Sequence, residues 1–138
     1  MRQVALSAIS FAYYDRDPAQ LDTTKMYHAI WNEHTPGSIP AEFHPQAAWG
    51  HLTGYSACYY TYVWSLVIAR DLLTPFRAKG NLTDPVLARR YAEEILAPGG
   101  SRPAEESIRA FLGRPFDLRA FQEWVRADER ENPTPGVH

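Results

Sequence analysis

Residues 51–64, which read HLTGYSACYYTYVW, carry an unusual number of phenol groups for one short stretch. Tyr55, Tyr59 and Tyr62 are spaced i, i+4, i+7, and this spacing places side chains on one face of an α-helix. His51 precedes the three tyrosines and lies at the end of the loop that leads into the expected helix. A row of phenols can donate hydrogen bonds to a carbonyl oxygen or a peptide backbone, and preorganised donors of this kind stabilise an oxyanion.

The same spacing also fits an aromatic core stripe, because Leu66 continues the face. Buried phenols need hydrogen-bond partners, however, and three phenols on one face could instead line a wet cleft. Tyr60 and Trp64 fall on other faces, which we expect to pack against the protein. The spacing alone therefore leaves a core stripe and a binding site as open alternatives.

Other residue patterns with chemical potential are weaker. Four residues separate His28 from Glu33, so the stretch HAIWNEH does not match the inverted zinc motif H-x-x-E-H. The forward motif H-E-x-x-H is absent from the sequence. Cys58 lies among apolar and aromatic neighbours, where we expect it to be buried and inert. Gly99 and Gly100 precede a predicted helix start, which could hold an anion or be a plain turn.

Composition limits the function further. The chain has 138 residues, 45% of them hydrophobic, which is enough for one domain with a sizeable core. The net charge of −2 and the lack of a basic patch predict no nucleic-acid or membrane partner. Residues 52–69 carry no formal charge, but their many hydroxyls would be costly to bury in lipid. The single cysteine favours a reducing, cytoplasmic setting.

The elements that must position these residues are all helical. The pattern predicts an all-α fold of about six helices, with a long irregular loop before residue 51. Cap residues, first-turn prolines and terminal glycines mark several of the boundaries. The expected helices are Gln3 to Tyr14, Thr23 to Glu33, about Tyr55 to Phe76 with Pro75 breaking or kinking its end, a helix capped by Thr83 or Asp84 and ending at Gly99-Gly100, a helix capped by Ser101 and stopped by Gly113, and a helix capped by Asp117 that runs through Arg126.

Three segments resemble the zinc oligopeptidases of the thimet oligopeptidase, dipeptidyl carboxypeptidase and oligopeptidase F family. They are RQVALSAISFAYYD at 2–15, HLTGYSACYYTYVWS at 51–65 and LAPGGSRPAEESIRAFLGRPFD at 96–117. Their order and distances fit the family, and the likeness extends to about residue 128. The resemblance implies the C-terminal, substrate-binding part of a larger helical zincin catalytic domain, here residues 1–130, followed by a disordered tail at 131–138.

The resemblance also implies roles for particular residues. His51 would contact the substrate near the scissile bond, and Tyr55 would hold the substrate backbone. Tyr59 and Tyr62 would be catalytic, through hydrogen bonds to the tetrahedral oxyanion. The stretch at Gly99-Gly100 would frame the substrate cleft. The sequence departs from the family by lacking one glycine between the histidine and the first tyrosine.

A larger departure concerns the metal. The family's zinc is held by H-E-x-x-H and a further glutamate, and none of these is present, so we expect no metal site and no cofactor in this chain. Zn²⁺ is expected only in the complete enzyme, where short peptides would be the partners. The isolated chain is expected to be inactive, and to associate with the missing N-terminal part of the catalytic domain or with itself. The alternative is a non-enzymatic helical module that binds a peptide or a partner chain.

Overall fold

The structure is a computed structural model that describes residues 2–131, with side chains as far as Ala127. This part of the chain contains helices and no β-strand, which confirms the all-α class. The tail expected from residue 131 lies outside the described residues, except for Glu131, which ends the last helix. The helices form two compact units, residues 2–64 and 65–131, and each is described by itself.

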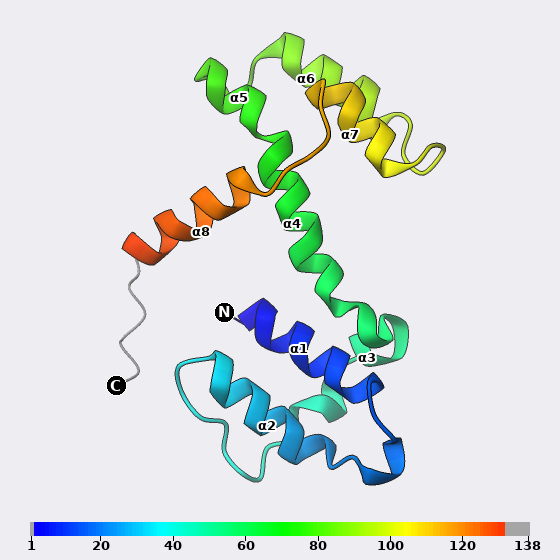
Figure 1. The fold of residues 1–138 in the computed structure, drawn as a ribbon, viewed down its shortest axis with the longest axis vertical. Helices are drawn as coiled ribbons and strands as arrows, with labels where there is room; N and C mark the ends of the chain where they lie inside the picture. The colour runs from blue at the N-terminus through cyan, green and yellow to red at the C-terminus, as the bar shows by residue number, and fades with distance from the viewer. Residues whose placement is uncertain (1, 132–138) are drawn as a thin grey trace. The chain divides into compact units, whose positions relative to one another are not determined.

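The first unit is built from two longer helices and several short turns of helix (Figure 1). Its elements are α1 (Arg2–Tyr14), η1 (Pro18–Gln20), α2 (Thr23–His34), η2 (Pro45–Ala48), α3 (His51–Gly54), η3 (Ser56–Tyr60) and the first residues of α4 (Thr61–Leu72). The ends of α1 and α2 lie close to the predicted ones. Asp22 caps α2 by accepting a hydrogen bond from the backbone N–H of Lys25 at 2.9 Å.

The core of this unit forms where α1 packs against α2 and η3. Its buried side chains are Leu6, Ile9, Tyr27 and Tyr59. Fully burying an aliphatic or aromatic side chain of this size stabilises a fold by about 1.5–3 kcal/mol. The core therefore ties η3, and with it the tyrosine stretch, to the first helix of the chain.

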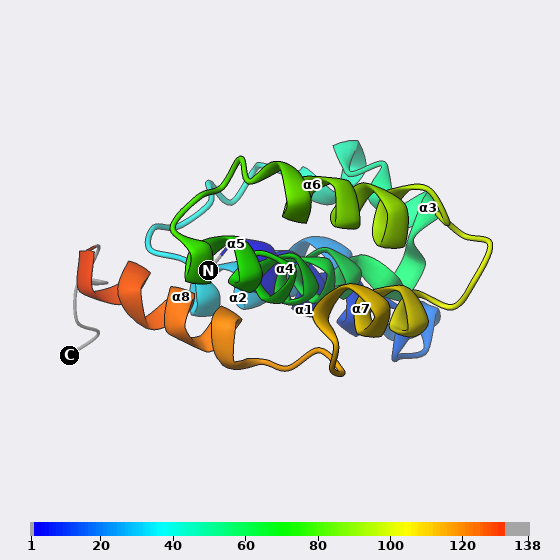
Figure 2. The same ribbon diagram turned by 90° about the horizontal axis from the view of Figure 1, so that it is seen from above.

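The second unit continues along α4 and ends with α8. Its other elements are α5 (Thr74–Lys79), α6 (Pro85–Tyr91), the π-helical turn η4 (Ala92–Leu96), α7 (Ala104–Leu112) and α8 (Arg119–Glu131). The chain reverses between η4 and α7 through residues 97–103 (Figure 2). Asp84 caps α6, and Gly113 ends α7 in the left-handed conformation with φ of 74°, both as predicted.

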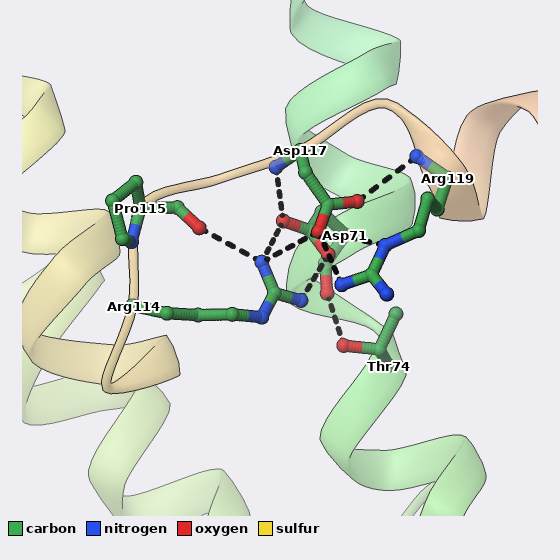
Figure 3. A network of polar contacts seen from close by, with 6 residues as sticks. All are labelled: Asp71, Thr74, Arg114, Pro115, Asp117 and Arg119. Atoms are coloured by element: carbon green, nitrogen blue, oxygen red, sulfur yellow. Dashed lines mark hydrogen bonds and ion pairs between the residues drawn. The ribbon is translucent and has the colours of Figure 1, made fainter.

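Two side chains organise the interior of this unit. Phe111 is 1% exposed and packs against the rings of Phe76 and Tyr91. Asp71, at the end of α4, is also 1% exposed and accepts hydrogen bonds from Arg114 and from the backbone N–H of Asp117 (Figure 3). The Asp71 contacts fix the segment between α7 and α8 against α4.

Several predicted boundaries are wrong. The helix expected from Tyr55 to Phe76 is three elements, because the backbone at Cys58 leaves the α-helical conformation and regular helix begins only at Thr61. The predicted break near Pro75 is present, since α4 ends at Leu72 and Pro75 lies in the first turn of α5. Ser101 does not cap α7, which begins at Ala104 after Pro103. The last helix passes the predicted end at Arg126 and reaches Glu131. Cap residues and terminal glycines located the helices, whereas the exact ends of helices are the least predictable part of them.

Candidate functional site

The ring of His51 lies among the rings of three tyrosines in the first unit. Its centroid is 5.7 Å from that of Tyr55, 5.2 Å from that of Tyr59 and 5.8 Å from that of Tyr62. The tyrosines also contact one another, at 5.4 Å between Tyr55 and Tyr62 and 4.9 Å between Tyr59 and Tyr62. We call these four side chains the aromatic cluster. The structure thus brings together four of the six predicted site residues.

The backbone gathers the cluster in a way that the spacing did not predict. His51 begins α3, a single helical turn in which its carbonyl accepts a hydrogen bond from the N–H of Tyr55 at 2.7 Å. Ser56 then has a φ of 49°, a left-handed conformation that costs a non-glycine residue roughly 1–2 kcal/mol. A 3-10 turn follows, and regular α-helix resumes only at Thr61. The rings meet because the chain is kinked, not because one long helix presents them.

The members of the cluster differ in exposure. Tyr59 is 6% exposed, belongs to the core of the unit, and meets the ring of Trp49 edge-on at 5.1 Å. Tyr55 and Tyr62 are 43% and 39% exposed. The cluster therefore combines one buried phenol, that of Tyr59, with two exposed phenols and an exposed imidazole.

Hydrogen bonding within the cluster affects the Tyr62 phenol. The side chain of Tyr55 raises the pKa of Tyr62 through a hydrogen bond, and desolvation and the nearby Tyr55 and Tyr59 phenols raise it further. A phenol is protonated at neutral pH even at its ordinary pKa, so the Tyr62 hydroxyl is a hydrogen-bond donor there. The accessible face of the cluster is thus suited to a neutral or anionic oxygen acceptor.

Two hydroxyls of α1 hold the backbone beneath the cluster. Ser10 donates to the carbonyl of Ser56 at 2.5 Å, and Tyr14 donates to the carbonyl of Leu52 at 2.5 Å. Sequence reasoning missed both residues, and it also missed Trp49. One sequence pattern could have pointed to Ser10 and Tyr14. Both belong to a narrow polar stripe on a helix that is otherwise apolar.

Three expectations about neighbouring residues are wrong. Cys58 is exposed, because it lies on the 3-10 turn rather than inside a packed helix. Tyr60 and Trp64 were expected on the packing side, yet they are 53% and 48% exposed. The loss of regular helix between residues 55 and 60 rotates these side chains away from the positions that helical periodicity assigns.

Gly99 and Gly100 belong to the second unit, in the turn that follows η4. Gly99 has a φ of 50°, which glycine adopts without steric cost. The guanidinium of Arg102 braces this turn by donating to the backbone carbonyl and the carboxylate of Glu94 and to the hydroxyl of Ser107. The role of the glycines in framing a cleft stays a prediction.

Two histidines outside the cluster, His28 and His44, make contacts with protein groups. His28 Nε2 lies 2.8 Å from the carbonyl of Phe43, and His44 Nδ1 lies 3.0 Å from the hydroxyl of Thr24. Among the side chains that the structure describes, those of residues 2–127, no group of three or more His, Cys, Asp or Glu could hold a metal ion. No helix in the described part of the chain is long and apolar enough to cross a membrane.

Residues 1–126 match Peptidase family M3. The chain belongs to this family. Its relatives include the mitochondrial intermediate peptidase of Aspergillus clavatus, 32% identical over 118 residues that make up 80% of this chain and 15% of that protein. The thimet-like oligopeptidase of Dictyostelium discoideum is 31% identical over 123 residues, 88% of this chain and 18% of that protein.

A third M3 relative, oligopeptidase A of Haemophilus influenzae, is 36% identical over 68 residues, 49% of this chain and 10% of that protein. The chain therefore spans less than a fifth of the length of these relatives. Residues 51–65 and the two flanking segments indicated a resemblance to zinc oligopeptidases. Membership of the M3 family confirms this resemblance.

Proposed function

We propose that this chain supplies the C-terminal, substrate-binding part of a zinc-dependent oligopeptidase of the M3 family. The observation that carries the proposal is the aromatic cluster, in which His51 and two accessible phenols converge on one surface. Family membership supports peptides as the substrate class. The complete enzyme would hydrolyse peptide bonds of short peptides.

Each member of the cluster has a role in this proposal. Tyr55 and His51 hold the backbone of the peptide, through hydrogen bonds to its carbonyl and amide groups. Tyr62 donates to the oxygen that becomes an oxyanion when the scissile carbonyl is attacked, and Tyr59 is the second donor. Tyr62 is the more accessible of these two donors, so we assign it the larger effect. Gly99 and Gly100 frame the substrate cleft in the complete enzyme.

The residues of this chain do not fit a catalytic zinc. H-E-x-x-H is absent from the sequence, and the described residues hold no cluster of metal-binding side chains. We propose that Zn²⁺ and its ligands belong to the complete enzyme, where the metal would activate water, and that this chain alone does not cleave peptides. No step of the proposed mechanism within this chain passes through a metal.

An assay of the 138-residue chain tests the proposal. Short peptides should perturb the NMR signals of His51 and of the cluster tyrosines in a saturable way, and Tyr55→Phe should weaken the effect. Tyr60→Phe is the matched control, because Tyr60 lies next to the cluster tyrosine Tyr59 but is not a member of the cluster. With added zinc, a fluorogenic peptide should remain uncleaved. Robust turnover, or no peptide binding at all, would overturn the proposal.

A non-enzymatic binding module is the second candidate. It is favoured by the apolar side chains Val4 and Phe11 of α1, which are 45% and 56% exposed. Exposed apolar surface on this helix suits a partner chain or a second copy of the module. Analytical ultracentrifugation should show self-association that Phe11→Ser weakens. A monomer at all concentrations would count against self-association.

We also propose a reducing compartment such as the cytoplasm. Its support is the use of a single cysteine, which is exposed and cannot form an internal disulfide. Some relatives bear a mitochondrial name, which describes those proteins. Fractionation of cells that express the full-length gene product would decide between the two compartments.

A further inference from the structure

The backbone between His51 and Tyr62 is not held by its own secondary structure. α3 has four residues, η3 is a 3-10 turn of five residues, and Ser56, the first residue of η3, has the left-handed φ of 49°. Short helical turns are marginal by themselves, and a non-glycine residue stays left-handed only when its surroundings fix it. Something outside this segment must therefore hold the geometry of the aromatic cluster.

The contacts that reach this backbone come from one face of α1. Ser10 and Tyr14 are four residues apart on the helix, so their side chains lie one above the other. The two carbonyls that they bind, of Ser56 and Leu52, are also four residues apart and lie on either side of Tyr55. Two hydroxyl groups from one face of α1 thus hold the backbone on both sides of Tyr55.

Burial makes one of these contacts hard to replace. Ser10 is 0% exposed, so water has little access to its hydroxyl. Removing that hydroxyl would take away the side-chain donor to the Ser56 carbonyl, at the residue where the backbone is strained. Tyr14 is 50% exposed, and the loss of its hydroxyl alone would change little of the surrounding packing.

We infer that Ser10 and Tyr14 are positioning residues for the aromatic cluster. Their hydroxyls hold the carbonyls of Ser56 and Leu52 so that His51 and Tyr55 stay against Tyr59 and Tyr62. Neither residue is assigned contact with the substrate. This positioning is independent of the proposed function, whereas its consequence for peptide binding rests on that function.

The test uses Tyr14→Phe and Ser10→Ala in the 138-residue chain. Three aromatic rings surround His51, so its ring protons should resonate well away from those of an unstructured histidine. Each variant should lose much of this displacement while the helical content seen by far-UV circular dichroism stays unchanged. Tyr14 is half exposed, so Tyr14→Phe should remain folded and decides the matter if Ser10→Ala unfolds.

Two matched controls remove hydroxyls from the same helix without touching residues 52–56. Ser7 donates to the carbonyl of Gln3 within α1, and Tyr13 donates to the carbonyl of Thr23. Ser7→Ala and Tyr13→Phe should leave the His51 signals where they are in the wild type. If Tyr14→Phe also leaves them unchanged, the positioning role is refuted.

Peptide titration separates this inference from the proposed function. If the wild type binds short peptides, Tyr14→Phe should raise the Kd about three- to tenfold, the loss expected from one hydrogen bond. Shifted His51 signals with no peptide binding by the wild type would support the positioning role and refute the proposed function. Unchanged signals and unchanged binding in the variant would refute the positioning role alone.

Discussion

The carboxylate of Asp71 accepts hydrogen bonds from both terminal nitrogens of Arg114, at 2.6 and 2.8 Å. The backbone N–H of Asp117 donates a third hydrogen bond to it at 2.9 Å (Figure 3). The two ends of the ion pair are not equivalent, because the side chain of Asp71 is 1% exposed and that of Arg114 is 35% exposed. This asymmetry sets what each substitution should do to stability.

Arg114→Ala should destabilise the protein more than Asp71→Ala does. Arg114→Ala leaves the buried carboxylate of Asp71 without its charged partner, and such a loss typically lowers the free energy of unfolding by about 3–5 kcal/mol. After Asp71→Ala the guanidinium can turn to water, so we expect a cost of about 1–3 kcal/mol from the lost hydrogen bonds. Urea denaturation monitored by circular dichroism gives both values.

The exposed ion pair between Glu105 and Arg109 provides the control, since its side chains are 65% and 59% exposed. Arg109→Ala should change the free energy of unfolding by no more than about 0.5 kcal/mol. Equal costs for Arg114→Ala and Asp71→Ala would mean that the buried carboxylate finds another partner.

Asp117 should make stability depend on pH in the acid range. The side chain of Arg119, followed by its backbone N–H, lowers the pKa of Asp117 from 3.8 to about 2. A carboxyl with a lower pKa in the folded state stabilises the fold fully above its unfolded pKa and loses this contribution as pH falls. The contribution should therefore fade between about pH 4 and about pH 2.

Comparison of the wild type with Asp117→Asn isolates this effect. The difference between their urea midpoints should be constant above about pH 5 and should shrink toward pH 2. High salt should reduce it, because the groups involved lie near solvent. A difference that does not change with pH would contradict the assigned pKa.

Local signals predicted much of the fold. Asp84 caps a helix and Gly113 ends one because their effects involve only neighbouring residues. Asp71 and Arg114 form an ion pair although they are 43 residues apart in the sequence. No local pattern identifies which of the 14 basic side chains contacts a buried aspartate. The tyrosine spacing predicted that Tyr55, Tyr59 and Tyr62 lie close together, but on one continuous helix that the structure does not have. It did not predict the left-handed Ser56 or the burial of Tyr59 against Trp49, because both depend on contacts made by other elements.

Cys58 should react readily in the native protein. The sequence suggested a buried, inert thiol, whereas the structure places it exposed on the 3-10 turn. A maleimide reagent should label the folded chain stoichiometrically without denaturant, and mass spectrometry measures the extent. If labelling required denaturation, Cys58 would be buried in the native protein, as the sequence suggested.

The Tyr62 phenol should titrate at higher pH than an isolated tyrosine. Its hydrogen bond with Tyr55 is the largest cause of the raised pKa. Tyr55→Phe removes that hydroxyl, so the pKa of Tyr62 should fall toward its ordinary value of 10.0. NMR titration of tyrosine ring carbons resolves the individual residues, with Tyr60→Phe as the control variant. An unchanged Tyr62 titration in Tyr55→Phe would remove the proposed interaction.

Tyr62→Phe should impair catalysis in a complete enzyme that joins this chain to a part carrying H-E-x-x-H. The phenol is proposed to donate mainly to the oxyanion, an interaction made in the transition state, so kcat should fall more than KM rises. Loss of one oxyanion donor typically lowers kcat by about 10²–10³-fold. Tyr55→Phe, at the residue proposed to hold the substrate backbone, should raise KM more than it lowers kcat. Steady-state kinetics with short peptides distinguishes the two patterns, and an unchanged kcat in Tyr62→Phe would remove Tyr62 from the proposed role.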